Sequence, residues 1–157
     1  MGVSGSGKTT VGSALARRLG WPFIEGDDFH PPANVAKMAA GHPLTDADRA
    51  PWLAALRRRI DELLASGESA VIACSALKHS YRSVLAGEDP RAVRFVQLDV
   101  PIEVLRERLE HRRGHFMPVS LLESQLATLE PSSTALRVDG TLPVDKILDQ
   151  VVEWLRS

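Results

Sequence analysis

The chain has 157 residues, 44% of them hydrophobic and 25% charged, which is the balance of one globular domain with a core of its own. Its formal net charge of −1, with acids and bases mixed along the sequence, argues against nucleic acid and an anionic membrane as partners. A single cysteine, Cys74, excludes an internal disulfide bond, and no apolar run reaches the roughly 18 residues of a membrane-spanning helix. We therefore expect a cytoplasmic protein with a single domain, residues 1–157.

The first element is a glycine-rich loop, GVSGSGKTT at residues 2–10, which matches the pattern G-x-x-x-x-G-K-[ST]. Glycines let successive backbone N–H groups curl round phosphate oxygens, and the amphipathic helix that follows points its N-terminus at the same anion. Lys8 would bridge the β- and γ-phosphates, and the Thr9 hydroxyl group would bind Mg²⁺. The loop predicts a nucleoside triphosphate, contacted here by Gly2, Val3, Ser4, Gly5, Ser6, Gly7, Lys8, Thr9 and Thr10.

A loop of this kind normally follows a hydrophobic strand, and no such strand precedes it in the sequence. In a doubly wound sheet that strand is usually central, so its loss would leave two unpaired edges inside the core. We therefore expect that the natural chain begins earlier, with Met1 an internal residue or a miscalled start.

A strand is expected next, at residues 22–25, and acidic residues follow it in IEGDDFHPPAN. Acids at the C-terminal end of a parallel strand beside a phosphate-binding loop lie where such sheets bind ligands. Asp27 could there accept a proton from a substrate hydroxyl group, and Asp27 or Glu25 could hold Mg²⁺ through water; a solvated turn is the alternative. Asp99 is a second candidate metal ligand, but we expect it to cap the helix after it.

Strands and amphipathic helices alternate through the rest of the chain. A helix at residues 44–67 begins at a capping box of Thr45 and Asp48, and Pro51 is expected to kink it or divide it in two. Another capped helix is expected from Ser120. Further strands are expected at residues 70–74, 93–98 and 136–139. This order predicts an α/β fold with a doubly wound parallel sheet flanked by helices.

Two arginines lie on a helix expected at residues 101–113. Arg108 and Arg112 are four residues apart, so they share one helix face, and the connector GHFMP follows them. Small-molecule kinases use an arginine-bearing lid of this kind to cover the triphosphate and neutralise charge on the moving phosphoryl group. An exposed, salt-bridged helix is the alternative, but the phosphate-binding loop in the same chain favours a lid at about residues 112–130.

Four blocks resemble the gluconate kinases (gluconokinases): GVSGSGKTT, EGDDFHPPANVAKMAAGHPLTDADRAPWL, CSALKHSYR and RRGHFMPVSLLESQLATLE. They run in order from residue 2 to about residue 130. The resemblance implies the P-loop fold of nucleoside monophosphate and shikimate kinases, ATP and Mg²⁺ as ligands, phosphorylation of D-gluconate at its 6-hydroxyl group, and a homodimer. The family usually has Asp-Gly-Asp where this chain has Glu25, Gly26 and Asp27, so Glu25 keeps the charge one methylene further out.

Gluconate is a small polyol with one carboxylate, so it needs a cation and several short polar groups. The candidate cations are Arg49, Lys78 and Arg82. Candidate contacts to the hydroxyl groups are His30, Asn34, Lys37 and Ser75, and His115 could close the pocket from the lid. The expected catalytic residues are Lys8 and Arg112, which would stabilise charge on the transferring group, and Asp27, which would orient or deprotonate the acceptor hydroxyl.

Two other functions stay open at this point. One is a kinase of the same fold that acts on shikimate or a nucleoside monophosphate, although the HPPAN and GHFMP blocks favour gluconate. The other is a non-catalytic, nucleotide-dependent switch or interaction module, which would lack an acceptor pocket.

Overall fold

The computed structural model describes residues 1–112 and 118–157. Helices and strands alternate in these ranges as the sequence predicts. Two short 3-10 helices, η1 and η2, accompany them. The bounds are α1 Lys8–Leu19, β1 Phe23–Glu25, η1 Gly26–Phe29, α2 Pro32–Ala39, α3 Asp46–Ser66, β2 Val71–Ala73, α4 His79–Ala86, β3 Val96–Asp99, α5 Ile102–Glu110, η2 Val119–Leu121, α6 Leu122–Thr128, β4 Leu136–Asp139 and α7 Val144–Arg156.

The strands form two parallel pairs. β1 pairs with β2, with Ile24 opposite Ile72, and β3 pairs with β4, with Leu98 opposite Val138. No strand of the described residues lies between β2 and β3, where Met1 instead bonds to β3: its N-terminal ammonium group donates to Val96 O at 2.5 Å, and Leu98 N donates to its carbonyl oxygen at 3.0 Å. The parallel α/β arrangement is confirmed, and the earlier start of the natural chain stays a prediction.

Capping residues set the helix ends. The phosphate-binding loop passes into α1 at Gly7, and α1 stops at Gly20, whose φ of 70° closes the helix with a left-handed residue. The Thr45 capping box is present at the start of α3, and Pro51 lies inside this one continuous helix and does not divide it. Ser120 does not cap a helix, because it lies within η2 and α6 begins after Leu121 without a side-chain cap. The expected helix cap at Ser120 is therefore wrong.

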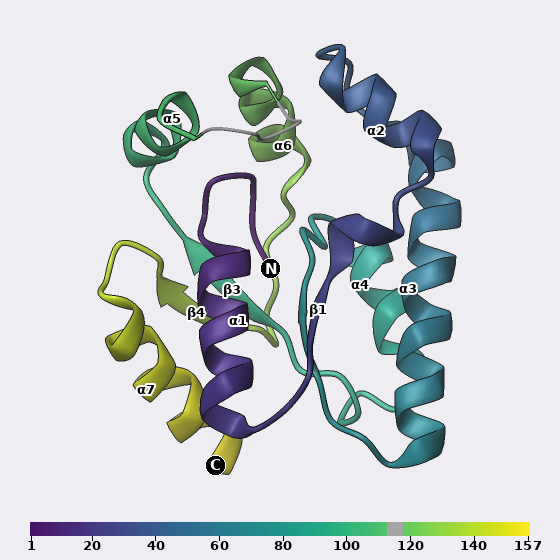
Figure 1. Cartoon of the computed structure of the whole chain (residues 1–157), viewed down its shortest axis with the longest axis vertical. Coiled ribbons are helices and arrows are strands. Elements are labelled where there is room, and N and C mark those ends of the chain that lie inside the picture. The colour runs from purple at the N-terminus through teal and green to yellow at the C-terminus, as the bar shows by residue number, and fades with distance from the viewer. Residues whose placement is uncertain (113–117) are drawn as a thin grey trace.

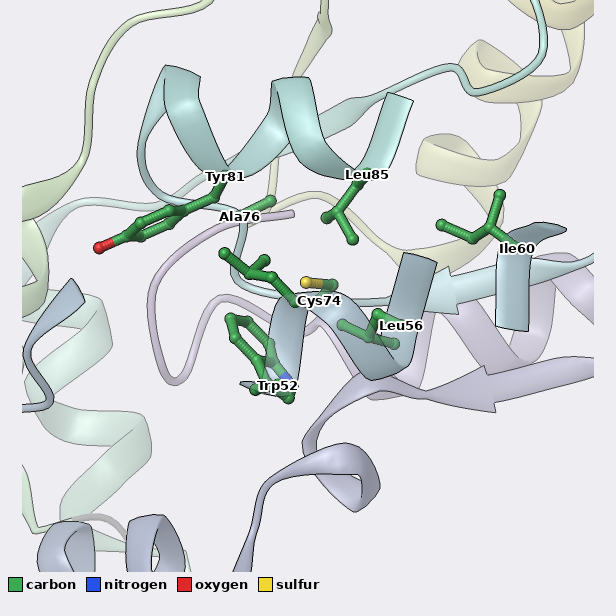
Figure 2. Packing of buried hydrophobic residues seen from close by; sticks show 8 residues of the cluster. Trp52, Leu56, Ile60, Cys74, Ala76, Tyr81 and Leu85 are labelled. Carbon is green, nitrogen blue, oxygen red and sulfur yellow. The ribbon is translucent and has the colours of Figure 1, made fainter. Parts of the chain in front are cut away.

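Helices cover the strands on both sides (Figure 1). α1 and α7 pack together and bury Leu15 and Val151 against Val138 of β4. α3 and α4 pack on the other side, and Figure 2 shows Cys74 between Leu56 of α3 and Leu85 of α4. None of the described helices combines the length and apolarity that crossing a membrane requires.

The loop before α1 (dark purple in Figure 1) lies at the same end of the molecule as α2, α5 and α6. β1 and β2 point their C-terminal ends toward this loop, because a parallel sheet joined by helices carries all its strand ends on one edge. Residues far apart in the sequence therefore meet around the phosphate-binding loop.

Candidate active site

The phosphate-binding loop is held open by glycines with left-handed backbone. Gly5 and Gly7 have φ values of 84° and 99°, which L side chains rarely adopt. A Cβ atom added to Gly5 would also lie 3.2 Å from Leu109 Cγ of α5. The loop thereby presents its backbone and the N-terminus of α1 to one point, the arrangement that binds phosphate in many proteins.

Lys8 begins α1 and folds back over the loop, where its Nζ donates to Val3 O at 3.0 Å. Burial lowers the pKa of Lys8, and the nearby carboxylate of Asp27 opposes this effect. The positive charge of Lys8 is thus held in a confined site with Asp27 close by. A polyphosphate bound beside it would stabilise that charge further.

A cavity of about 340 Å³ joins the loop to the C-terminal ends of β1 and β2. Its wall contains a large part of the predicted site. The predicted residues that line it are residues 4–10 together with Asp27, His30, Arg49, Ser75, Arg108 and Arg112. Gly2, Val3, Asn34, Lys37, Lys78 and Arg82 do not line it, and His115 lies outside the described residues.

Two carboxylates lie where β1 ends. The Thr9 hydroxyl group donates to Glu25 Oε2 at 2.5 Å, and Glu25 and Asp27 both line the cavity. Hydroxyl and carboxylate oxygens are the ligands that Mg²⁺ prefers, so the donor set fits this ion. Among the described residues there is no group of three or more His, Cys, Asp or Glu side chains that could hold a metal ion.

Gly26 lies between the two acidic residues and passes close to β2. A Cβ atom at this residue would lie 2.4 Å from Ala73 O of β2, so only glycine allows the backbone to pass so close. The carbonyl oxygen of Gly26 also accepts a hydrogen bond from Trp52 Nε1 at 2.8 Å. The sequence showed this glycine between two acids, but its contact with β2 appears only in the fold.

His30 stands beside Asp27 in a buried position. Its ring stacks on Trp52 with the centroids 4.4 Å apart and the planes 12° apart, and its Nε2 lies 4.0 Å from Asp27 Oδ1. Burial, reinforced by the charge of Arg49, lowers the pKa of His30 to about 4. The imidazole is therefore neutral near pH 7.

Of the three candidate cations, Arg49 alone lines the cavity among the described residues. Its Nη1 donates to Tyr81 Oη at 2.9 Å, which holds the guanidinium group in place. Lys78 pairs with Asp46 at 3.0 Å. Arg82 is buried and donates to the backbone oxygens of Ala76, Leu77, Glu130 and Pro131, so, contrary to the expectation, it braces the backbone away from the cavity.

Asn34 and Lys37 also lie elsewhere than expected. Lys37 Nζ donates to Asp48 Oδ2 at 2.6 Å, and Asn34 Nδ2 donates to Asp48 O at 2.8 Å. Both residues belong to α2 and Asp48 to α3, so they fasten these two helices together and do not line the cavity. Asp99, expected to cap α5, instead accepts hydrogen bonds from Gln97 and Arg137, and that expectation is wrong.

The two arginines of the predicted lid differ in role. Arg108 donates to Gly5 O at 3.1 Å and to Gly140 O at 3.0 Å, so it ties the phosphate-binding loop to the turn after β4. Arg112 lies just after α5 with an exposed side chain, lines the cavity, and is near enough for its charge to lower the pKa of Lys8. Sequence reasoning missed Gln125 of α6, whose Oε1 accepts a hydrogen bond from Ser4 N at 2.7 Å.

Comparisons with known proteins agree on the fold and the family. A family described as an AAA domain matches residues 1–132. The gluconokinase of Gluconobacter oxydans (strain 621H) is 54% identical over 160 residues, covering 100% of this chain and 89% of the relative. A sugar kinase from Janibacter sp. HTCC2649 has a TM-score of 0.91 at 47% identity, covering 99% of this chain and 91% of that one. A gluconokinase from Sinorhizobium meliloti 1021 has a TM-score of 0.83 at 49% identity, covering 99% and 93%.

Proposed function

The chain belongs to the gluconokinase family, and from this premise we propose that it transfers the γ-phosphoryl group of ATP to the 6-hydroxyl group of D-gluconate. The products are ADP and 6-phospho-D-gluconate. The observation that carries the proposal is a single cavity that joins the phosphate-binding loop to Asp27, His30 and Arg49. A phosphoryl donor at the loop and a small hydroxylated acid at these three residues can meet there.

At the donor end, the loop amides and the N-terminus of α1 bind the phosphates of ATP. Lys8 and Arg112 stabilise the charge that develops on the transferring group, since both line the cavity at the loop. Thr9, Asp27 and Glu25 are the residues that would hold Mg²⁺, which when bound neutralises charge on the β- and γ-phosphates.

At the acceptor end, Arg49 is the cation that pairs with the gluconate carboxylate, and its bond to Tyr81 supports this role because the guanidinium group is already oriented. Ser75, next to the end of β2, contacts a hydroxyl group. Asp27 orients the 6-hydroxyl group and takes up its proton as the oxygen attacks the γ-phosphorus. The P–O bond to ADP then breaks, and the protein forms no covalent intermediate.

We also propose the domain organisation, the cellular location and the oligomeric state of the protein. The chain is a single domain, residues 1–157, and its segment at about residues 112–130 is a lid. The hydrogen bond between Ser4 and Gln125 supports the lid, because it joins that segment to the phosphate-binding loop. We also propose a cytoplasmic homodimer. One buried cysteine fits a reducing compartment, and sedimentation at micromolar concentration tests the dimer.

The test is ADP release in a coupled assay with D-gluconate, its stereoisomers, shikimate and AMP. We expect kcat/KM for D-gluconate to exceed that for shikimate or AMP by at least about 100-fold, the size of discrimination that hydrogen-bonded hydroxyl groups allow. Equal rates with shikimate or AMP would overturn the acceptor assignment. Slow ATP hydrolysis that no small acid stimulates would instead favour a nucleotide-dependent module.

A further inference from the structure

The buried side-chain amide of Asn34 can be oriented from the two atoms that it contacts. Its side-chain nitrogen lies 2.8 Å from the carbonyl oxygen of Asp48 and 3.2 Å from Nδ1 of His30. A backbone carbonyl oxygen can only accept hydrogen bonds, so the Asn34 atom beside it is the NH₂ group and not the amide oxygen. The orientation of the amide therefore follows from its chemistry.

This orientation dictates which ring nitrogen of His30 carries a hydrogen. The Asn34 NH₂ group has two hydrogens and accepts no hydrogen bond; one hydrogen points to Asp48 O and the other to His30 Nδ1. Nδ1 must then be the accepting nitrogen without a hydrogen. In a neutral imidazole the hydrogen consequently resides on Nε2.

The direction of Nε2 is also fixed. The ring of His30 is stacked on Trp52, and Trp52 is anchored by its own bond to Gly26 O. A 180° flip of the imidazole would put a carbon in place of Nδ1 and break the bond to Asn34, and a smaller rotation would break the stack. Nε2 therefore faces Asp27 Oδ1 at 4.0 Å, a distance too long for a direct hydrogen bond.

We propose that Asn34 is a positioning residue that keeps His30 in its Nε2–H form, and that this N–H and the Asp27 carboxylate bind the same hydroxyl oxygen of the acceptor. An oxygen about 2.8 Å from both atoms spans their separation with an angle of roughly 90° at the oxygen, which a hydroxyl group tolerates. It accepts from Nε2–H, donates its own hydrogen to Asp27, and keeps a lone pair for the phosphorus.

This inference deepens the proposed function and rests on it where it names a polyol hydroxyl group as the ligand. The tautomer of His30 does not depend on the identity of the substrate. A bare Nε2 would compete with Asp27 for the hydroxyl hydrogen, whereas Nε2–H cannot accept it and leaves it to Asp27. The Asn34 amide thus acts on catalysis through His30 without touching the substrate.

The first test reads the tautomer directly by long-range ¹H–¹⁵N NMR on the ¹⁵N-labelled full chain near pH 7. The His30 signals are assigned by their loss in His30→Gln. We expect a hydrogen on Nε2 and none on Nδ1, and a change at Nε2 when D-gluconate and ADP are added. A hydrogen on Nδ1, or a ring unaffected by saturating D-gluconate, overturns the inference.

The second test separates the two nitrogens kinetically. In His30→Gln the new amide nitrogen lies near the former Nε2, whereas in His30→Asn it lies near the former Nδ1; both variants lose the stack on Trp52. We expect kcat of His30→Gln to exceed that of His30→Asn by about tenfold, the worth of one net hydrogen bond. Equal kcat values would contradict the shared-oxygen arrangement.

Asn34→Asp inverts the hydrogen-bonding requirement, because a carboxylate accepts from Nδ1–H. We expect Nδ1 of His30 to gain a hydrogen and kcat to fall about tenfold with KM for ATP unchanged; an Nδ1 that still carries no hydrogen refutes the positioning role. His79→Gln, at an exposed residue outside the cavity, is the matched control and should keep the wild-type kcat.

If the wild-type protein does not phosphorylate gluconate, the proposed function fails. The NMR experiment still shows which ring nitrogen of His30 carries the hydrogen.

Discussion

Replacing Gly26 by alanine is expected to lower kcat by roughly 10- to 100-fold while the protein still folds. The added Cβ atom would lie 2.4 Å from the carbonyl oxygen of Ala73, whereas real Cβ contacts stay beyond 3.0 Å. The two backbone segments, Gly26 and Ala73 of β2, must therefore separate by at least about 0.6 Å, which displaces the chain between Glu25 and Asp27 unless β2 takes up the whole shift. A misplacement of about 1 Å near reacting groups can cost 10²-fold in rate, and the overpacking itself costs about 1–3 kcal/mol of stability.

The assay compares kcat, KM for both substrates and the melting temperature of wild type, Gly26→Ala and Gly12→Ala. Gly12 is a matched control because it lies inside α1, where a Cβ atom would meet side chains alone: the ring of Phe23 at 2.9 Å and Val71 Cγ1 at 3.7 Å. That ring is a side chain and can rotate, and alanine favours the helix by about 0.5–1 kcal/mol. Gly12→Ala should keep its activity. Gly26→Ala with kcat within twofold of wild type would refute the link between the strand contact and the carboxylates.

Three further predictions concern single groups of the site. Arg112→Ala should lose on the order of 10³ in kcat with little change in ATP affinity, and an equal loss in both would mean that Arg112 binds only ground-state ATP. Asp27→Asn should bind ATP, as measured by calorimetry, but not transfer phosphate; substantial residual turnover would remove its role as base. The pKa of His30 is about 4 in the folded protein and 6.5 in the unfolded chain, so between these pH values the unfolded chain binds more protons. The free energy of unfolding should therefore fall as the pH drops from 6.5 to 4. Denaturation of His30→Gln across this range should show a shallower fall, and an identical pH dependence would contradict the assigned pKa.

The parts of the site that follow from local sequence were predictable. The loop at residues 2–10 is defined by backbone conformation and helix geometry within a few residues, so its glycines and Lys8 could be recognised without the fold. Asp27 could also be placed, because a strand end beside such a loop is a known ligand position. Arg49 was one of three candidate cations, and only its contact with Tyr81 and the cavity distinguishes it.

The errors arise where a side chain meets partners distant in sequence. Arg82 satisfies carbonyl oxygens at residues 130 and 131, and Asp99 pairs with Arg137 on the neighbouring strand. Neither pairing leaves a pattern in the segment that contains the arginine or the acid. Asn34 was expected to contact a substrate hydroxyl group, but its partners are His30 and Asp48, which lies on the next helix. The local sequence pattern indicates which interactions a side chain can make, and the fold determines the partner with which it makes them.

The stack of Trp52 on His30 gives the protein an intrinsic optical reporter. Its three indole rings lie in three different surroundings: Trp21 is 36% exposed, Trp154 lies under the Arg94 guanidinium group at 3.8 Å, and Trp52 is buried against an imidazole. Emission from Trp52 should therefore be blue-shifted relative to Trp21 and respond to changes at the imidazole. Occupancy of the acceptor site can then be followed by fluorescence in unlabelled protein, with Trp21 as the internal solvent reference.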